Sequence, residues 1–201
     1  MASIYLFEDE ELSDDASLIN RFYRLANQEE TQELATTLSS SMGNEAVENR
    51  WDKIRELWDY RVDMLDPGEE DHNTEIWHFI NCVRNATTTT LQKEESRIIQ
   101  SLPFVANHTV HWRRIEEWLA EQAADNPDVT ITIYDELVGA VPCDEWSSIA
   151  RTSQQKYRSS LYDSAEDSGE ETLQTALDIA DHFAAENNQM DEEFLKRHLP
   201  V

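Results

Sequence analysis

The sequence predicts an all-α protein. Apolar residues recur at steps of three and four along most of the chain, which is the period of an amphipathic helix. The chain has only 4 Gly and 5 Pro among its 201 residues, which argues against a loop-rich or all-β protein. One segment, residues 129–133, alternates apolar and polar residues like a strand, but the sequence offers no second strand with which it could form a sheet.

The N-terminal part of the chain predicts two helices that follow an acidic lead over residues 1–12. Residues 13–15, Ser-Asp-Asp, offer N-caps to the first helix. The apolar stripe of this helix consists of Leu18, Ile19, Phe22 and Leu25. The second helix is expected over Glu29–Met42, where Leu34 and Leu38 lie four residues apart on one face.

The strongest helical pattern covers Glu45–Leu65. Its apolar positions form one continuous face, which needs a partner layer to be stable. These positions are Val47, Trp51, Ile54, Leu57, Trp58, Val62 and Leu65. A single long helix is therefore expected, and Pro67 and Gly68 end it.

Three further helices are expected in the middle of the chain. A loop over Glu69–His72 leads to a helix over Asn73–Arg84, and the next helix covers Leu91–Leu102 because Pro103 follows it. Another helix spans Thr109–Ala124. Its buried side is expected to consist of Val110, Trp112, Ile115, Trp118 and Leu119.

The segment over residues 129–141 fits two patterns. Its first five residues alternate as in a strand, whereas its later apolar residues follow a helical period. The residues with helical spacing are Ile133, Leu137, Val138 and Val141. A helix is the preferred interpretation, because a lone strand would have no partner, and Pro142 would end that helix.

The C-terminal part of the chain predicts three more helices. The first begins at residue 143 or 144 and continues through Leu161, and an exposed acidic loop over Asp163–Glu171 follows it. The last two helices, a longer and a short one, have apolar stripes made of Leu173, Ala176, Leu177, Ala180 and Phe183, and of Phe194, Leu195 and Leu199.

The spacing of these helices predicts their arrangement. From Glu45 onwards most helices begin about 20 residues apart, so helix pairs recur at about 40 residues, within the range of HEAT repeats. We expect antiparallel helix pairs that stack as a short HEAT-like α-solenoid or pack as an irregular helical bundle. Residues 13–201 are expected to form a single helical domain.

The charge balance predicts the environment of the protein. Asp and Glu number 42 against 16 Lys and Arg, which gives a net charge of -26. An acidic surface with few Lys suits a salt-rich cytoplasm, because the same surface would repel itself at low ionic strength. No run approaches the ~20 apolar residues of a membrane span, so we expect a cytoplasmic protein with no membrane contact.

The sequence contains no pattern that indicates catalysis or a cofactor. Cys82 and Cys143 match no metal or redox spacing, and the His108-x-x-His111 pair has no third ligand nearby. Four isolated Gly form no phosphate-binding loop. We therefore expect a protein that is not an enzyme, with no catalytic residues, no cofactor and no metal.

Two groups of arginines are the candidate interaction residues. Arg50, Arg55 and Arg61 share the long predicted helix, and Arg113 and Arg114 share another. They could contact nucleic acid, but a net charge of -26 repels phosphates. Pairing with carboxylates of neighbouring helices is the favoured interpretation, because Arg binds carboxylates in a bidentate manner. No direct contact with nucleic acid is expected.

Residues 51–62 carry a resemblance to a known group of proteins. Their Leu-Trp-x-x-Arg core resembles helices in the C-terminal α-helical arrays of large haloarchaeal proteins, some of which belong to defence systems with a nucleotidase or ATPase domain upstream. Residues 98–104, 112–127 and 175–183 are similar in order and spacing. The resemblance implies a HEAT-like scaffold joined to an effector domain, and it transfers no catalytic residue to this chain.

These observations lead to two main hypotheses of function. The first is a non-enzymatic scaffold of a halophilic archaeon or its virus, which binds a protein partner or a neighbouring domain. The alternative is an acidic DNA mimic that inhibits a DNA-binding defence enzyme by presenting carboxylates at the spacing of phosphates. Acidic residues crowded on one face would favour the mimic, and acidic residues spread over all helices would favour the scaffold. A helical hydrolase or transferase is a third possibility that no motif supports.

Overall fold

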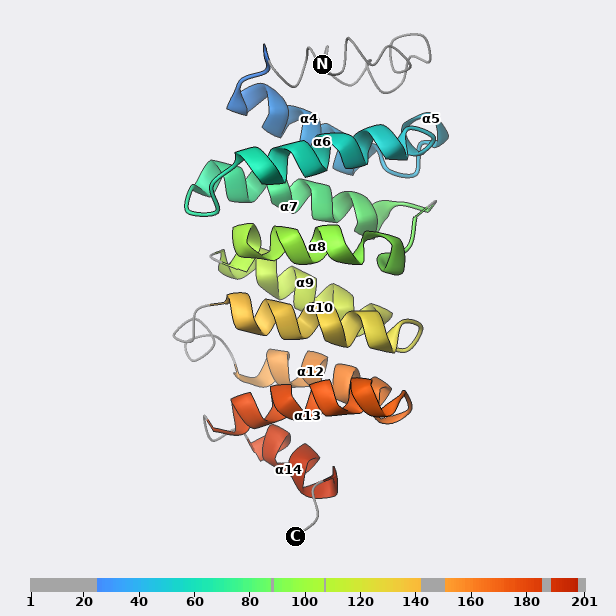
Figure 1. Cartoon of the computed structure of the whole chain (residues 1–201), viewed down its shortest axis with the longest axis vertical. Helices are drawn as coiled ribbons and strands as arrows, with labels where there is room; N and C mark the ends of the chain where they lie inside the picture. The colour runs from blue at the N-terminus through green and yellow to red at the C-terminus, as the bar shows by residue number, and fades with distance from the viewer. Residues whose placement is uncertain (1–24, 88, 107, 142–150, 186–188, 199–201) are drawn as a thin grey trace. The chain divides into compact units, whose positions relative to one another are not determined.

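The computed structural model describes residues 25–87, 89–106, 108–141, 151–185 and 189–198 (Figure 1). Within these ranges every regular element is an α-helix and no strand occurs. The prediction of an all-α protein is therefore confirmed. The acidic lead predicted over residues 1–12 lies outside the described residues, as does nearly all of the helix predicted after it. No described helix is both long and apolar enough to cross a membrane.

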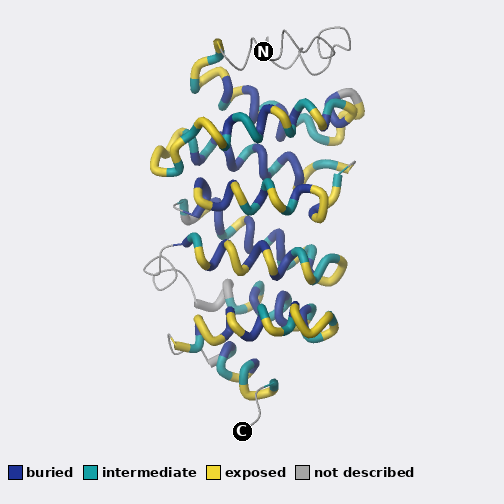
Figure 2. The backbone as a smooth tube through the Cα atoms, in the orientation of Figure 1, coloured by how far each residue is buried: buried dark blue, intermediate teal, exposed yellow. Residues whose placement is uncertain are grey.

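The chain divides into two compact units, residues 1–108 and 109–201, and each is described by itself. Each helix has one buried stripe and one exposed stripe, as Figure 2 shows by colour. The single domain predicted over residues 13–201 depends on how the two units sit together, so that expectation stays a prediction.

The described residues of the first unit form one short helix and four longer ones. These are α4 (Gln28–Ser41), α5 (Glu45–Glu48), α6 (Trp51–Met64), α7 (Glu70–Asn85) and α8 (Leu91–Ala106). Helix α4 begins with a reciprocal cap, in which Glu30 N–H donates to Asn27 Oδ1 and Asn27 N–H donates to Glu30 Oε2. Helix α7 packs against α4, α6 and α8, and its buried face supplies Ile76, Trp77, Phe79, Ile80, Cys82 and Val83 to the core.

The long helix predicted over Glu45–Leu65 is wrong in one respect, because a turn at residues 49–50 divides it into α5 and α6. The cause is the buried side chain of Glu48. Its carboxylate accepts hydrogen bonds from the N–H groups of Gly43 at 2.8 Å and Thr87 at 3.0 Å. Gly43 has a φ of 93°, a conformation that favours glycine. Helix α5 therefore positions the carboxylate of Glu48 to bind the backbone of two loops, at Gly43 and at Thr87.

Two other boundaries in this unit also differ from the prediction. Helix α7 begins at Glu70, so most of the predicted loop over Glu69–His72 is helical, and acids in its first turn are favoured by the helix dipole. Helix α8 continues through Pro103 to Ala106. The helix tolerates this proline because the three residues that follow it are buried, and their packing offsets the lost hydrogen bond.

Helices that are not neighbours in sequence run parallel in the first unit. Trp51 Nε1 donates to Glu94 Oε1 at 2.7 Å, and Trp58 Nε1 donates to Ser101 Oγ at 2.9 Å, each across 43 residues. Because two positions of α6 meet two positions of α8 in the same order, the two helices point in the same direction.

The second unit contains five described helices. They are α9 (Thr109–Gln122), α10 (Pro127–Ala140), α12 (Arg151–Glu166), α13 (Glu170–Ala184) and α14 (Gln189–His198). Helix α9 packs on α10 and α12, and α13 packs on α10, α12 and α14. The core of this unit includes Trp112, Ile115, Leu119, Ile133, Tyr134, Leu137, Tyr162, Ala180 and Phe194.

Helix α10 confirms the helical interpretation of residues 129–141. The alternating threonines do not share one face, because Thr130 is buried and Thr132 is exposed. Their hydroxyl groups donate to carbonyl oxygens one turn earlier, of Asn126 and Asp128. Pro127 stands in the first turn, where a helix tolerates it.

The acidic loop predicted over Asp163–Glu171 is wrong over most of its length. Helix α12 continues to Glu166 and α13 begins at Glu170, which leaves a connection of residues 167–169. Ala165 is fully buried, so packing favours a continued helix despite the acidic composition. The predicted start of the preceding helix at residue 143 or 144, and Pro142, lie outside the described residues.

Candidate interaction site

The arginines singled out in the sequence have different surroundings in the structure. Arg61 forms an ion pair with Glu75 of α7, with Nε 2.7 Å from Oε1. The side chain of Glu75 is 0% exposed and also accepts hydrogen bonds from Gln28 and Thr31 of α4. Arg61 therefore joins three helices of the first unit and has a structural role.

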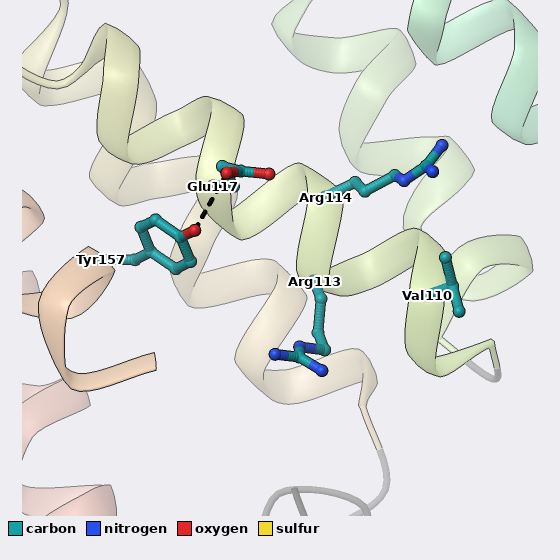
Figure 3. Close-up of a pocket in the computed structure, with 5 residues that line it drawn as sticks. All are labelled: Val110, Arg113, Arg114, Glu117 and Tyr157. Carbon is teal, nitrogen blue, oxygen red and sulfur yellow. Dashed lines mark hydrogen bonds between the residues drawn. The ribbon is translucent and has the colours of Figure 1, made fainter. Parts of the chain in front are cut away.

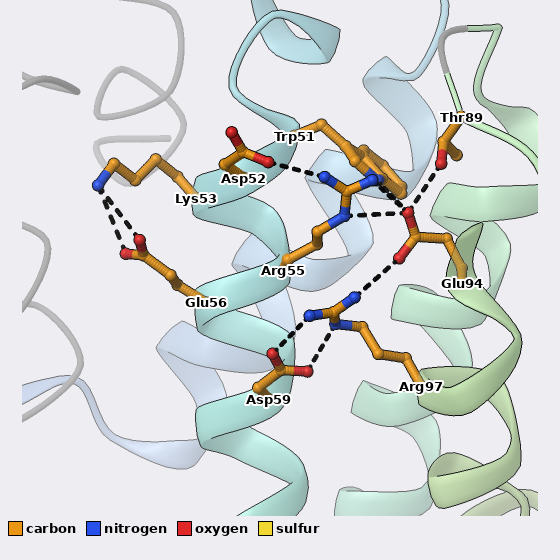
Figure 4. A network of polar contacts seen from close by, with 9 residues as sticks. All are labelled: Trp51, Asp52, Lys53, Arg55, Glu56, Asp59, Thr89, Glu94 and Arg97. Atoms are coloured by element: carbon orange, nitrogen blue, oxygen red, sulfur yellow. Dashed lines mark hydrogen bonds and ion pairs between the residues drawn. The ribbon is translucent and has the colours of Figure 1, made fainter.

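Arg55 belongs to a second interhelical network, drawn in Figure 4. Its Nη2 lies 2.6 Å from Glu94 Oε1 of α8, and the same oxygen accepts hydrogen bonds from Trp51 Nε1 and Thr89 Oγ1. Burial opposes ionisation of Glu94, but the hydrogen bonds from Arg55, Trp51 and Thr89 outweigh it and hold the pKa of Glu94 below its ordinary value.

The network continues along α6 and α8 through Arg97. Its guanidinium forms a bidentate contact with Asp59, at 2.7 Å and 2.8 Å, and its Nη1 lies 3.2 Å from Glu94 Oε2. Arg50, by contrast, lies in the turn before α6, where its backbone N–H donates to the carbonyl of Val47. The structure thus places Arg55 and Arg61 between helices and Arg50 at a helix start.

Arg113 and Arg114 line a groove of the second unit (Figure 3). The groove has a volume of about 220 Å³, and its lining residues are Val110, Arg113, Arg114, Glu117 and Tyr157. Four of them lie on α9 at positions 110, 113, 114 and 117, a helical spacing that places them in one stripe along that helix. Tyr157 of α12 forms the side wall. We call these five residues the α9 groove.

The polar contacts of the α9 groove leave one cation exposed. Tyr157 donates its hydroxyl hydrogen to Glu117 Oε1 at 2.9 Å, and this hydrogen bond raises the pKa of Tyr157. Arg114 is exposed and has no hydrogen bond or ion pair from its side chain to any described residue. Val110 is 52% exposed, so its assignment to the buried side of this helix is wrong.

Tyr157 and Glu117 were not singled out as site residues in the sequence. The pattern that could have revealed Glu117 is its position one turn after Arg113 and Arg114 on the polar face of the predicted helix. Tyr157 carries no such signal, because its contact with α9 spans 40 residues and depends on how the helices pack.

A buried carboxylate lies next to the α9 groove on the same helix. Glu116 is 0% exposed, and its Oε1 accepts a hydrogen bond from Tyr134. Burial raises the pKa of Glu116 to about 7, although Tyr134, Arg158 and Arg113 act in the opposite direction. Glu116 does not line the groove, so it has no access there to a substrate.

A second cavity of about 430 Å³ lies between α12 and α14. Its lining mixes acids with bases and includes Asp163, Glu193, Lys196 and Arg197. Lys196 is already 3.0 Å from Glu192, and Arg197 is 2.9 Å from Glu166. The cations of this cavity therefore have carboxylate partners, unlike Arg114 in the α9 groove.

The described residues contain no cluster of three His, Cys, Asp or Glu side chains that could hold a metal ion. Cys82 is fully buried, and burial raises the pKa of its thiol, which makes it a poor nucleophile. Cys143 lies outside the described residues. The α9 groove is therefore the described cavity with an exposed arginine that lacks a described partner, a feature suited to a negative group.

Comparison with known proteins finds no match to this chain among family models, curated proteins or solved structures.

Proposed function

We propose that this chain is a non-enzymatic helical scaffold that binds a protein partner or a neighbouring domain through the α9 groove. The observation that carries the proposal is the pairing of an exposed apolar residue, Val110, with an exposed arginine, Arg114, in one cavity. Aromatic residues and Arg are enriched at protein interfaces, and both types line this groove.

The register of the helices supports a stacked scaffold. Side-chain contacts between helices that are not sequence neighbours join residues 43 positions apart for α6 and α8, 44 apart for α10 and α13, and 40 apart for α9 and α12. These separations agree with the period of about 40–47 residues of HEAT and armadillo repeats, whereas the contacts of Asp191 in the short last helix α14 with α12 span 29 and 33 residues. Within each unit, we therefore favour a short α-solenoid over an irregular bundle.

The distribution of acids supports a salt-rich environment for this scaffold, in a halophilic archaeon or its virus. Exposed Asp or Glu occurs in every described helix except α8. This spread agrees better with an acidic coat than with a DNA mimic, which would gather carboxylates on one face. In line with the resemblance to haloarchaeal helical arrays, we propose that the scaffold serves a larger defence assembly in the cytoplasm.

Photo-crosslinking from the groove tests the binding function. A photoreactive benzoyl-phenylalanine at Val110 should yield one adduct in the native host, and the partner should then bind the purified chain with defined stoichiometry. Met64 provides the matched control, since it is 63% exposed but lies on α6 in the other unit. The same probe at Met64 should give no such adduct, and Arg114→Glu should abolish the adduct at Val110. Equal adducts at both positions would contradict the proposal.

A further inference from the structure

We propose that the α9 groove binds a single carboxylate side chain, Asp or Glu, of the partner protein, with the guanidinium group of Arg114 as its main contact. The inference rests on the proposed scaffold function and adds the chemical class of the ligand. It depends on three properties of the groove: an arginine without a side-chain partner among the described residues, an acid that already accepts a hydrogen bond, and a small volume.

Arg114 differs from most described arginines, although not from Arg84, because its side chain has no hydrogen bond or ion pair to any described residue. Acidic residues outnumber basic ones by 42 to 16, so most arginines can find a carboxylate within the fold. Arg55, Arg61 and Arg158 each have a carboxylate partner at 3.1 Å or less. Arg114 has none among the described residues, and it lines a cavity. An arginine in this setting is suited to a carboxylate supplied from outside, since the two groups can form a bidentate contact.

Glu117 is committed to another contact. It lies three residues after Arg114 on α9, a spacing that allows an ion pair within a helix. Its Oε1 instead accepts the hydrogen bond from Tyr157 at 2.9 Å. In Figure 3 the side chain of Arg114 extends away from the Glu117–Tyr157 pair. Glu117 therefore forms no ion pair with Arg114, and the guanidinium group of Arg114 can contact a ligand.

The size of the groove fits one side chain. Sites for small molecules have volumes of about 300 Å³ or more, and the α9 groove has about 220 Å³. Val110 offers an apolar surface one turn from Arg114, against which the methylene groups of Asp or Glu can pack. A whole nucleotide cofactor would exceed this volume.

The net charge of the chain favours a ligand with a single carboxylate over a polyanionic ligand. A chain of charge -26 repels nucleic acid and acidic tracts, and in molar KCl this repulsion acts only over about 3 Å, between groups that are nearly in contact. A partner segment that carries one carboxylate among neutral or basic residues avoids this repulsion, and its basic residues are attracted to the acidic coat. We therefore expect the binding segment to contain one acid flanked by Lys or Arg.

Nuclear magnetic resonance titration of the full ¹⁵N-labelled chain in molar KCl tests this ligand class. The probes are the peptide acetyl-Ala-Leu-Glu-Lys-Ala-amide, the same peptide with Gln in place of Glu, and inorganic phosphate. The Glu peptide should shift the side-chain Nε–Hε signal of Arg114 in a saturable manner. The Gln peptide should bind about tenfold more weakly or worse, because it lacks the charged acceptor.

Two variants make the result specific. Arg114→Gln should abolish the response of neighbouring groove signals while the helical circular dichroism stays unchanged. Arg84→Gln is the control, since Arg84 is also exposed and without a side-chain partner among the described residues, but lies at the end of α7. This control should bind the Glu peptide as the unmodified chain does.

Three outcomes would overturn the inference. Equal binding of the Glu and Gln peptides would exclude carboxylate recognition, tighter binding of phosphate would assign the groove to a phosphoryl group, and equal loss in both arginine variants would indicate non-specific attraction. If the peptide fails but the probe at Val110 still captures its partner, only the carboxylate assignment is wrong. Failure of the crosslinking experiment would contradict the scaffold function itself.

Discussion

Tyr134 of α10 donates a hydrogen bond of 2.9 Å to Glu116 Oε1 of α9, while Glu116 Oε2 is buried without a hydrogen-bond partner. The nearby buried guanidinium of Arg158 is already paired with Asp191, at 3.1 Å and 3.3 Å. The guanidinium group of Arg158 is therefore bonded to Asp191 and acts on Glu116 only through its charge. Glu116 is the less well satisfied of the two, and it is best accommodated in its protonated form.

Glu116 should make the stability of the protein fall with rising pH. Its pKa is raised from 4.5 to about 7 in the folded chain, so the folded state binds the proton more tightly than the unfolded state. The free energy of unfolding should decrease by about 3 kcal/mol between pH 4.5 and 7 from this group, and its contribution should be constant above that range. Urea denaturation at several pH values in constant molar KCl measures the slope.

The variant Glu116→Gln should reduce this slope, because Gln stays neutral at every pH, and the remaining slope should come from other acids with raised pKa values such as Asp135. Glu121→Gln is the matched control, since Glu121 is an exposed acid of the same helix. It should keep the slope of the unmodified chain. An unchanged slope in Glu116→Gln would show that Glu116 is not the group that titrates.

Glu94 should have the opposite dependence on pH. Its pKa is held below the ordinary value, so its contribution to stability is present above about pH 4.5 and is lost as the pH falls through the pKa of the folded state. Glu94→Gln should cost about 3 kcal/mol at neutral pH, because Arg55 and Arg97 lose the acid between them. Chemical denaturation measures both effects.

An exposed acid on α6 provides the control for Glu94. Glu56 is 56% exposed and lies 3.4 Å from Lys53. Glu56→Gln should change the free energy of unfolding by less than about 0.5 kcal/mol. A similar loss in both variants would indicate a general effect of charge instead of the buried network.

The hydrogen bond between Trp58 and Ser101 should be measurable by a double-mutant cycle. Both side chains are fully buried, and the Trp58 ring also stacks on Phe79. Ser101→Ala should cost about 1–3 kcal/mol, because it leaves Trp58 Nε1 buried without an acceptor. In the Trp58→Phe background the same substitution should cost clearly less. Additive costs would show that the bond contributes nothing to stability.

The helical fold should depend on salt. At ~50 mM salt the exposed carboxylates are barely screened from one another, so the far-UV helical signal should be lost, and molar KCl should restore it. Asp135, Glu136 and Asp178 form a local group of acids, and burial together with the other two acids raises the pKa of Asp135. The triple variant to Asn, Gln and Asn should fold at a lower KCl concentration. Full helicity of the unmodified chain at low salt would contradict the halophilic assignment.

The helical class and most helices could be predicted from the sequence, because apolar periodicity reports directly on which face of a helix is buried. The errors occurred where tertiary contacts override local signals. Pro103 usually marks a helix end, but the buried residues after it keep α8 helical. The carboxylate of Glu48, at the end of α5, accepts a hydrogen bond from Thr87, which lies 39 residues later, and no local pattern reveals that partner.

The buried acids were also missed, although the sequence contains a signal for them. Glu94 lies three residues after Leu91 and four before Ile98, on the apolar stripe of its helix. Glu116 falls between Trp112 and Leu119 in the same way. In a chain with 42 acids this placement is easily taken for chance. The α9 groove could not be predicted because it depends on how α12 packs on α9, and helical periodicity does not specify that packing.

The contact of Glu94 with α6 limits how the lengths of α6 and α8 can change in evolution. A slide of α8 along α6 by one turn, about 5.4 Å, would carry Glu94 away from Trp51 and Arg55 and leave its charge buried and unpaired. Gains or losses of whole turns within these helices should therefore be rejected by selection. Length variation should accumulate in the connections, which makes the connections the natural places for inserting a reporter domain or a new recognition loop.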